Sequence, residues 1–293
     1  MTTRNYRITT DSNTEVPLSV AKAHDLCFVP MDYLLDGQEY FYDLGEATDY
    51  KAFFNAVRGG KIPNTSTYPP AYYVDLWQPM LEAGLDVLHL SFSSQLSAAY
   101  RNLSEACDQL NAQYGETRVV TVDTKSISGG GAVLVCGALE RQAAGQSMPE
   151  VLAWVEESIP LVNHWFTVDD LNHLRRGGRL SATSAVFGTM LSVKPILTLN
   201  SEGKVVAFDK VKGRRKALAY LVDRTRERAV DPEHNDVVLL HGDCLEEALE
   251  VQEALLRDVP FRHCYLQFVG PVIGTHAGPD VMGICFLGKQ RPE

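Results

Sequence analysis

Hydroxyl-bearing residues crowd into the stretch HLSFSSQLSAAYRNL, which runs from His89 to Leu103. They lie where an apolar run typical of a strand gives way to a helical pattern. The N-terminus of a helix has unpaired N–H groups and a dipole that favours negative charge. Hydroxyl donors beside it can therefore form a binding site for a carboxylate or a phosphate. Ser93, Ser94 and Ser97 fit this arrangement. The alternative is that Ser94 or Ser97 only caps the helix, because serine is among the commonest N-cap residues.

Two other stretches carry side chains of the same kind. NTSTYPP places Thr65 and Ser66 before a predicted helix that begins with proline. IGTHAGPD holds Thr275 and His276 in a predicted loop, whose glycines, Gly278 among them, let the backbone approach a ligand closely. Each stretch also has a structural interpretation, since most hydroxyls before a helix are caps and most lone histidines are satisfied structural residues.

The signatures of common catalytic sites are missing from the sequence. It contains no GxSxG, no GxxxxGK[ST], no HExxH, and no GxGxxG after the first predicted strand. SGGG, from Ser128 to Gly131, resembles a phosphate-binding loop but lacks the following lysine. A Ser/His acyl hydrolase that uses Ser93 or Ser94 with His276 is the enzymatic alternative, although no obvious acid orients that histidine. The sequence therefore favours a binding protein without catalytic residues.

Two basic segments stand out on an acidic chain. RRGGR contains Arg175, Arg176 and Arg179, and KVKGRRK runs from Lys210 to Lys216. Such runs are usually solvated faces, and the alternative is a single patch that binds a phosphate or an acidic partner. The formal net charge of −10 and the pI near 5.3 exclude bulk binding of nucleic acid.

The cysteines and the amino terminus indicate a cytoplasmic protein. The cysteines form no CxxC and no Cys/His ligand spacing, so we predict buried free thiols and no metal site. MTTRNYRITTDSN lacks the apolar region of a signal peptide, and nowhere do 18 uncharged apolar residues run together, so no membrane insertion is predicted. The cysteines are Cys27, Cys107, Cys136, Cys244, Cys264 and Cys285.

Strand and helix patterns alternate through the first half of the chain. Residues 6–10 form a predicted strand, and a polar turn then leads into a predicted helix over 18–25. Repetition of this unit predicts a largely parallel sheet covered by helices on both faces. With 293 residues and a composition shift near Asn163, we predict an N-terminal α/β domain over 1–162 and a C-terminal α/β domain over 163–293.

Turn signals add two hairpins and a final loop. One hairpin is predicted at Asp36-Gly37 and the other around residues 201–203. The last stretch, YLQFVGPVIGTHAGPDVMGICFLG, is interpreted as two strands around a glycine-rich loop.

Six stretches together carry a family resemblance. They are, in order, TTDSNTEVP, NTSTYPP, SFSSQLSAAY, VDTKSISGGG, LRRGGRLSATSAVFGTMLSVKPIL and VGPVIGTHAGPDVMG. In these motifs the chain resembles the DegV family of bacterial fatty-acid-binding proteins, of the FakB type, over nearly its whole length. The resemblance implies two α/β domains with a long-chain fatty acid between them, and neither metal nor cofactor. It also implies a partner, a fatty acid kinase of the FakA type, to which the fatty acid is presented for acyl-phosphate formation and phospholipid synthesis.

The same resemblance implies which residues bind the carboxyl head of the fatty acid. Hydroxyls and helix N–H groups would supply the several donors that a buried carboxylate needs, without a permanent buried cation. The implied carboxyl-binding residues are Thr65, Ser66, Ser93, Ser94 and His276. Further contacts to the head group, a partner or a phosphate would fall to Ser97, Thr275, Gly278, Arg175, Arg176 and Arg179.

The chain departs from the family pattern at three motifs. SGT after SSxL becomes SAA at Ser97 to Ala99, TSxPS becomes TSTYPP with Tyr68 at the usual proline, and HTGPG becomes HAGPD with Asp280 at its end. These changes concern the head-group contacts and leave the fold inference unaffected.

Overall fold

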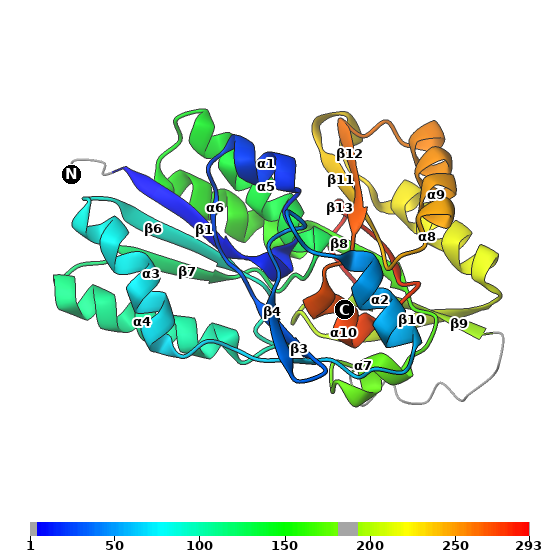
Figure 1. Cartoon of the computed structure of the whole chain (residues 1–293). Helices are drawn as coiled ribbons and strands as arrows, with labels where there is room; N and C mark the ends of the chain where they lie inside the picture. Colours follow the sequence, from blue (N-terminus) through cyan, green and yellow to red (C-terminus); the bar gives the residue numbers. More distant parts are fainter. Residues whose placement is uncertain (1–4, 181–192, 293) are drawn as a thin grey trace.

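The computed structural model of this chain describes residues 5–180 and 193–292 (Figure 1). Residues 181–192, within the motif LRRGGRLSATSAVFGTMLSVKPIL, lie outside the described residues. The N-terminal half contains a parallel sheet in the order β2-β1-β6-β7, whose neighbouring strands pair in the same direction. Its strands are β1 (Tyr6–Asp11), β2 (Cys27–Val29), β6 (Asp86–Ser91) and β7 (Val119–Asp123).

Helices cover both faces of this sheet. In Figure 1, α3 and α4 lie below it, whereas α1, α5 and α6 lie above it. The pairs α3 with α4 and α5 with α6 also pack against each other. The predicted parallel sheet between two helical layers is thus confirmed. The helices are α1 (Leu18–Ala23), α3 (Pro70–Glu82), α4 (Ala99–Tyr114), α5 (Gly129–Ala143) and α6 (Met148–Ser158), with a short 3₁₀ helix η1 (Ser12–Thr14) after β1.

A small antiparallel sheet in the order β4-β3-β5 stands beside the parallel one. Its β3–β4 hairpin turns at Asp36 and Gly37, whose φ angles of 54° and 79° match a tight two-residue turn, so that prediction is confirmed. Helix α2 (Tyr50–Arg58) follows, and its side chains Phe53, Phe54 and Val57 are buried. The strands are β3 (Asp32–Leu35), β4 (Gln38–Phe41) and β5 (Asn64–Thr65).

The C-terminal half forms a six-stranded mixed sheet in the order β10-β9-β8-β13-β11-β12. Only β11 and β12 pair in parallel, and the last strand, β13, lies between β8 and β11. The predicted hairpin between β9 and β10 is confirmed, with Gly203 at a φ of 87° in its turn. The strands are β8 (Val162–Thr167), β9 (Val193–Leu199), β10 (Val205–Lys212), β11 (Asp236–His241), β12 (His263–Phe268) and β13 (Met282–Leu287).

The two faces of the C-terminal sheet pack against different layers. One face carries Trp165, Met282 and Ile284, which pack with side chains of α8 and α9. The opposite face carries Leu240 and Cys285, which belong to the core that continues into the N-terminal half. The division of the chain at 162/163 stays a prediction. The remaining helices are α7 (Asn172–Arg176), α8 (Arg214–Arg228), α9 (Leu245–Asp258) and the 3₁₀ helices η2 (Ile159–Leu161) and η4 (Pro232–His234).

The SGGG motif allows close packing at the start of α5. A Cβ at Gly130 would lie 1.9 Å from Nε2 of His164, and one at Gly129 would lie 2.7 Å from a methyl carbon of Leu240. Glycine therefore lets α5 lie directly against β8 and β11. This helix, which belongs to the N-terminal half, is thereby wedged against the C-terminal sheet.

The predicted glycine-rich loop before β13 is wrong, because this stretch is a helix, α10 (Pro271–Ala277). Pro271 occupies the first helical turn, where its missing N–H is not needed, and Gly278 ends the helix at a φ of 78°. N–H groups of Gly274 and Gly278 donate to the carbonyls of Gly270 and Gly274, both at 2.8 Å. Pro271 and Gly278 thus mark the two ends of a short helix and do not indicate a loop.

Within residues 5–180 and 193–292, no helix is long and apolar enough to cross a membrane. No group of three or more His, Cys, Asp or Glu side chains in the same ranges is arranged to hold a metal ion. All six cysteines have free thiols, and Cys107, Cys136 and Cys285 are buried.

Candidate ligand-binding site

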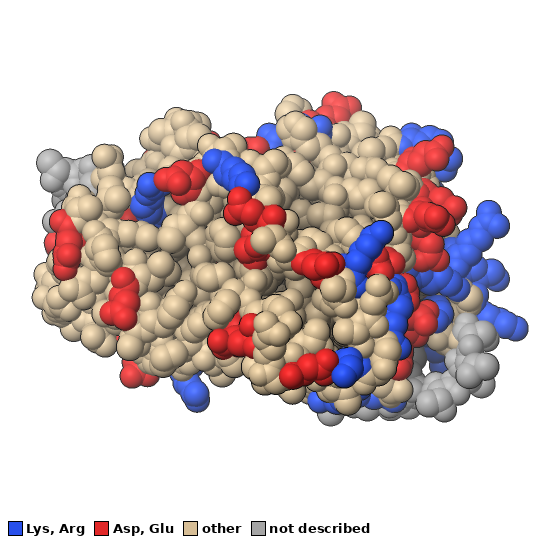
Figure 2. Space-filling model, viewed as in Figure 1, with Lys and Arg blue, Asp and Glu red and all other residues tan. Residues whose placement is uncertain are grey.

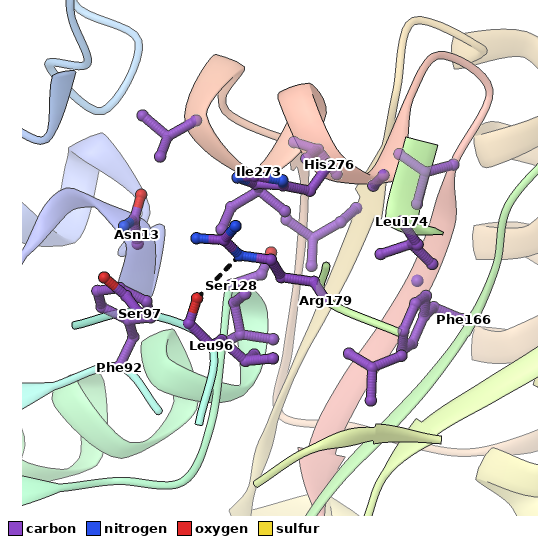
Figure 3. A pocket seen from close by; sticks show the side chains of 18 of the residues that line it. Asn13, Phe92, Leu96, Ser97, Ser128, Phe166, Leu174, Arg179, Ile273 and His276 are labelled. Atoms are coloured by element: carbon purple, nitrogen blue, oxygen red, sulfur yellow. Dashed lines mark hydrogen bonds between the residues drawn. The ribbon is translucent and has the colours of Figure 1, made fainter. Parts of the chain in front are cut away.

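A cavity lies between the two halves of the molecule, with about 910 Å³ of empty space, part of it open to solvent (Figure 3). Most of the side chains that line it are apolar. These are Met31, Phe92, Leu96, Ile127, Phe166, Leu174, Val205, Leu240, Val269, Val272, Ile273, Ala277 and Val281, with Gly283 and Cys285 on β13.

Thr65 and His276 come from different halves of the molecule and meet at the polar pole of this cavity, the end that also contains Ser66, Ser97 and Arg179. Oγ1 of Thr65, on β5, lies 3.2 Å from Nε2 of His276, on α10. Burial, followed by the nearby charge of Arg179, lowers the pKa of His276 to about 4, so the imidazole is neutral at neutral pH. Nδ1 of His276 is buried and has no hydrogen-bond partner among the described residues.

Arg179 reaches into the same pole from the segment after α7. Its Nε donates to the carbonyl of Leu96 at 3.1 Å, and Nη1 donates to the carbonyl of Gly177. Figure 3 shows the guanidinium between Leu96 and the helix that carries His276. Burial lowers the pKa of Arg179, and none of the ion pairs among the described residues includes it. Arg179 is thus a half-buried cation in the cavity lining, and its contact with a head group stays a prediction.

Ser66 is next to Thr65 and also lines the cavity. Its hydroxyl donates to Oδ2 of Asp32 at 2.5 Å. Asp32 begins β3 and is only 3% exposed. The NTSTYPP motif thus contributes one hydroxyl paired with a histidine and a second paired with a buried acid.

The serine cluster after β6 divides into two groups. Ser97 lines the cavity, and its hydroxyl accepts from the N–H of Ala99 at 3.1 Å, so it also serves the start of α4. Ser93 and Ser94 are not among the lining residues. The buried hydroxyl of Ser93 donates to the carbonyl of Gly203 at 2.9 Å, in the β9–β10 turn, and accepts from the N–H of Gln95. A direct contact of Ser93 or Ser94 with a ligand stays a prediction.

The remaining candidates lie around the pole rather than in its lining. Thr275 is buried, and its hydroxyl donates back to the carbonyl of Pro271 at 2.9 Å. Gly278 ends α10, and a Cβ there would lie 2.5 Å from the ring of His173. On α7, Arg175 is half-buried, and exposed Arg176 lies 3.0 Å from Nδ1 of His173. Only Arg179 of the RRGGR motif enters the cavity.

Comparison with known proteins assigns the chain to a family. A family model described as "uncharacterised protein, DegV family" matches residues 5–289. The chain belongs to the DegV family. A DegV domain-containing protein of Clostridium perfringens is 34% identical over 288 residues, covering 98% of this chain and 99% of that relative. Protein DegV of Bacillus subtilis is 29% identical and covers 97% of this chain and 100% of that relative.

Solved structures of DegV family proteins share the whole fold. A DegV family protein from Thermus thermophilus, described as binding fatty acid, superposes with a TM-score of 0.87 at 29% identity, covering 97% of this chain and 99% of its own. DegV from Bacillus subtilis, described as a fatty acid binding protein, gives a TM-score of 0.82 at 27% identity, covering 98% and 100%. The architecture of this chain is therefore that of the DegV fold.

Sequence reasoning missed three polar residues that line the DegV-fold cavity, namely Asn13, Ser128 and His164. Both Asn13 and Ser128 lie at strand-to-helix junctions, where Asn13 was interpreted as a cap residue of the polar turn and Ser128 as part of an incomplete phosphate-binding motif. The N–H of Ser128 donates to the carbonyl of Asn13 at 2.8 Å, which places the two junctions side by side. His164 lies within the apolar strand β8, and no local signal distinguished it from a core histidine.

Glu15 links the same region to α10 and was also missed. It is fully buried, and its carboxyl oxygens accept from the hydroxyl of Ser128 and the N–H of Gly270. Its backbone carbonyl accepts from Nε2 of Gln267 at 2.6 Å. Burial, only partly opposed by these hydrogen bonds, raises the pKa of Glu15 to about 8. The start of α10 is thus held by an acid that is protonated at neutral pH.

Proposed function

We propose that this protein binds a long-chain fatty acid between its two halves, with the carboxyl group at the pole formed by Thr65, Ser66, Ser97, Arg179 and His276. The observation that carries this proposal is the gathering of these polar groups in a cavity whose lining is mostly apolar. A fatty acid has the same division, with one polar end and a long apolar chain. Fatty-acid binding by the DegV relatives from Thermus thermophilus and Bacillus subtilis supports the same assignment.

The apolar walls supply affinity and the polar pole supplies orientation. Burying about fifteen methylene groups at about 0.8 kcal/mol each contributes about 12 kcal/mol before the costs of association and ordering. The pole adds hydrogen bonds from hydroxyls and from Arg179, whose guanidinium donates in a planar fork suited to a carboxyl group. The neutral imidazole of His276, which contacts Thr65, is the remaining polar group of the pole.

We further propose that the bound fatty acid is presented to a kinase of the FakA type for acyl-phosphate formation, as the FakB resemblance implies. Exposed basic side chains that do not enter the cavity would contact the partner or its phosphate. Figure 2 shows Lys and Arg gathered at the right-hand end of this face, over the C-terminal sheet. Exposed basic residues that do not line the cavity include Lys212, Arg215 and Lys216 of the KVKGRRK segment and Arg176 on α7.

The hydrolase alternative lacks support from the geometry. His276 has its hydrogen-bond partner in Thr65, while the hydroxyl of Ser93 donates to the carbonyl of Gly203. A nucleophilic serine needs its hydroxyl within hydrogen-bond reach of the general base. Release of p-nitrophenol from p-nitrophenyl laurate, at a rate that exceeds the buffer rate and depends on Ser93, would favour the hydrolase.

Native mass spectrometry of the purified protein, followed by solvent extraction of the ligand, tests fatty-acid binding directly. We expect a bound acyl species, or stoichiometric uptake of added palmitate or oleate. Repeated absence of both would contradict the proposal. Acyl-phosphate formation from the loaded protein by a fatty acid kinase and ATP tests presentation separately.

A further inference from the structure

A buried acid stands directly behind the polar pole. Oδ2 of Asp32 accepts the hydrogen bond from Ser66 at 2.5 Å. Oδ1 of Asp32 is also buried and has no hydrogen-bond partner among the described residues. No ion pair of residues 5–180 and 193–292 includes Asp32. A buried acceptor without a hydrogen bond is unfavourable, so Oδ1 of Asp32 needs a hydrogen bond from a ligand or from a neighbouring group.

Asp32 determines which hydrogen bonds Ser66 can make with a ligand in the cavity. A serine hydroxyl has a single proton, and here it points at Asp32, so only the lone pairs of the Ser66 oxygen remain for a ligand. Arg179, which lines the same cavity, can only donate. The pole therefore has a donor side at Arg179 and an acceptor side at Ser66 and Asp32.

We infer that Asp32 makes the site selective for a head group with a hydrogen-bond donor, so that the fatty acid binds as the neutral, protonated acid. This inference rests on the proposed function. The carbonyl oxygen of a protonated carboxyl group accepts from Arg179, and its O–H donates to the acceptor side. A carboxylate has no proton to donate to this acceptor side.

The groups around Asp32 keep one protonation state between pH 6 and pH 8. His276 on α10 is neutral there, with a pKa lowered to about 4, and burial followed by the charge of Asp32 raises the pKa of Tyr68. The adjacent strand β4 carries Glu39 and Tyr40 in register with Leu34 and Tyr33 rather than with Asp32. The other strand beside β3, β5, consists of Asn64 and Thr65 and contributes no titratable group.

The ligand's own carboxyl group therefore controls the predicted pH dependence. Its chemistry is that of a glutamate side chain, whose ordinary pKa is about 4.3. Above that pH, each further unit leaves about tenfold less of the protonated ligand in solution. Apparent affinity for the acid should fall in proportion until the bound acid itself ionises.

Two ligands of equal chain length separate this effect from others. Isothermal titration calorimetry should compare lauric acid, below its micelle concentration, with dodecanamide, whose head group carries N–H donors at every pH. From pH 6 to pH 8 we expect the dissociation constant of lauric acid to rise by about 100-fold and that of dodecanamide by less than about threefold. Buried Asp11 and Glu15, with pKa values raised to about 7 and about 8, titrate in this window but affect both ligands.

Asp32→Asn tests the assigned residue. An asparagine amide can donate to the oxygen of Ser66, which frees the hydroxyl proton for a carboxylate. We expect the pH dependence for lauric acid to fall below about threefold and its binding at pH 8 to tighten by at least about tenfold, because the carboxylate then has a donor at Ser66. Asp36→Asn is the matched control, because Asp36 lies at the exposed tip of the same hairpin, 3.1 Å from Lys61.

The outcomes separate this inference from the proposed function. Lauric acid that binds with equal affinity at pH 6 and pH 8 would overturn the inference and leave fatty-acid binding in place. An unchanged pH profile in Asp32→Asn, with the variant folded and binding dodecanamide, would also overturn it. Failure of both ligands to bind at any pH would remove the proposed function as well.

Discussion

Gly177 lies against His276 so closely that a Cβ at position 177 would come within 2.3 Å of Nδ1 of the imidazole. Gly177 ends α7 at a φ of −72°, which any residue adopts, so only this close approach requires glycine. Because His276 also contacts Thr65, Gly177 helps to set the position of the imidazole at the polar pole. One glycine of the basic RRGGR motif thus packs directly against a residue of the cavity lining.

Gly177→Ala should displace His276 and weaken ligand binding. The added methyl group overpacks the contact, which typically costs about 1–3 kcal/mol, and the imidazole can move only by giving up its contact with Thr65. The measurement is fatty-acid affinity together with the NMR signals of the His276 ring. Unchanged affinity and unchanged ring signals would show that α7 shifts instead of His276.

Arg179→Ala and Arg176→Ala should differ in their effects on fatty-acid affinity. Arg179 lines the cavity, and loss of a charged donor to a buried carboxyl group should cost about 1.5–3 kcal/mol of binding. Arg176 is exposed and contacts His173, so its removal should leave affinity nearly unchanged while weakening kinase-dependent acyl-phosphate formation. Displacement of a fluorescent fatty acid, beside kinase-coupled turnover, measures both. Equal losses of affinity in the two variants would contradict this division.

Glu15→Gln should change how stability depends on pH. The pKa of Glu15 is raised from 4.5 to about 8, so between these values the folded state keeps a proton that the unfolded state has lost. Stability of the wild-type protein therefore falls as pH rises, by up to about 1.4 kcal/mol per pH unit from this group. The glutamine variant lacks that slope, so its stability relative to wild type should increase from pH 5 to pH 8.

Urea unfolding at several pH values measures this difference. Glu46→Gln is the control, because Glu46 is exposed and pairs with Lys22 at 2.6 Å on the surface. Asp11, with a pKa raised to about 7 by burial, adds a slope of the same sign in all three proteins and cancels in the comparison. Parallel pH profiles for wild type and Glu15→Gln would show that Glu15 is not the titrating group.

Gly283→Leu should shorten the ligand that the cavity accepts. Met282 and Ile284 pack toward α8 and α9, so the alternation along β13 directs position 283 into the cavity, where Gly283 is a lining residue. A Cβ there would meet Phe166 at an ordinary 3.4 Å, and a longer side chain would extend into the space for the acyl chain. We expect weaker binding of stearate with little change for laurate. Equal losses for both acids would instead indicate general damage to the fold.

Local patterns predicted most of the elements correctly because their signals act over a few residues. Asp36-Gly37 turns a hairpin wherever two β-rich segments flank it. The apolar segment before the serine cluster became β6, and the spacing after it became α4. Local signals failed at Pro271 to Gly278, where proline and glycine suit the two ends of a short helix as well as a loop.

The sequence by itself determined most of the strands and helices and both hairpin turns, and with them the kinds of side chain that reach the junctions between strands and helices. Only the tertiary structure decided which of these side chains meet. Thr65 and His276 are 211 positions apart, and Ser93 donates to a carbonyl 110 positions away. Ser97 faces the cavity whereas Ser93 does not, and Arg179 enters it whereas Arg176 does not. Neighbours in sequence receive such different partners because side-chain direction and burial depend on how α5, α10 and the two sheets pack together.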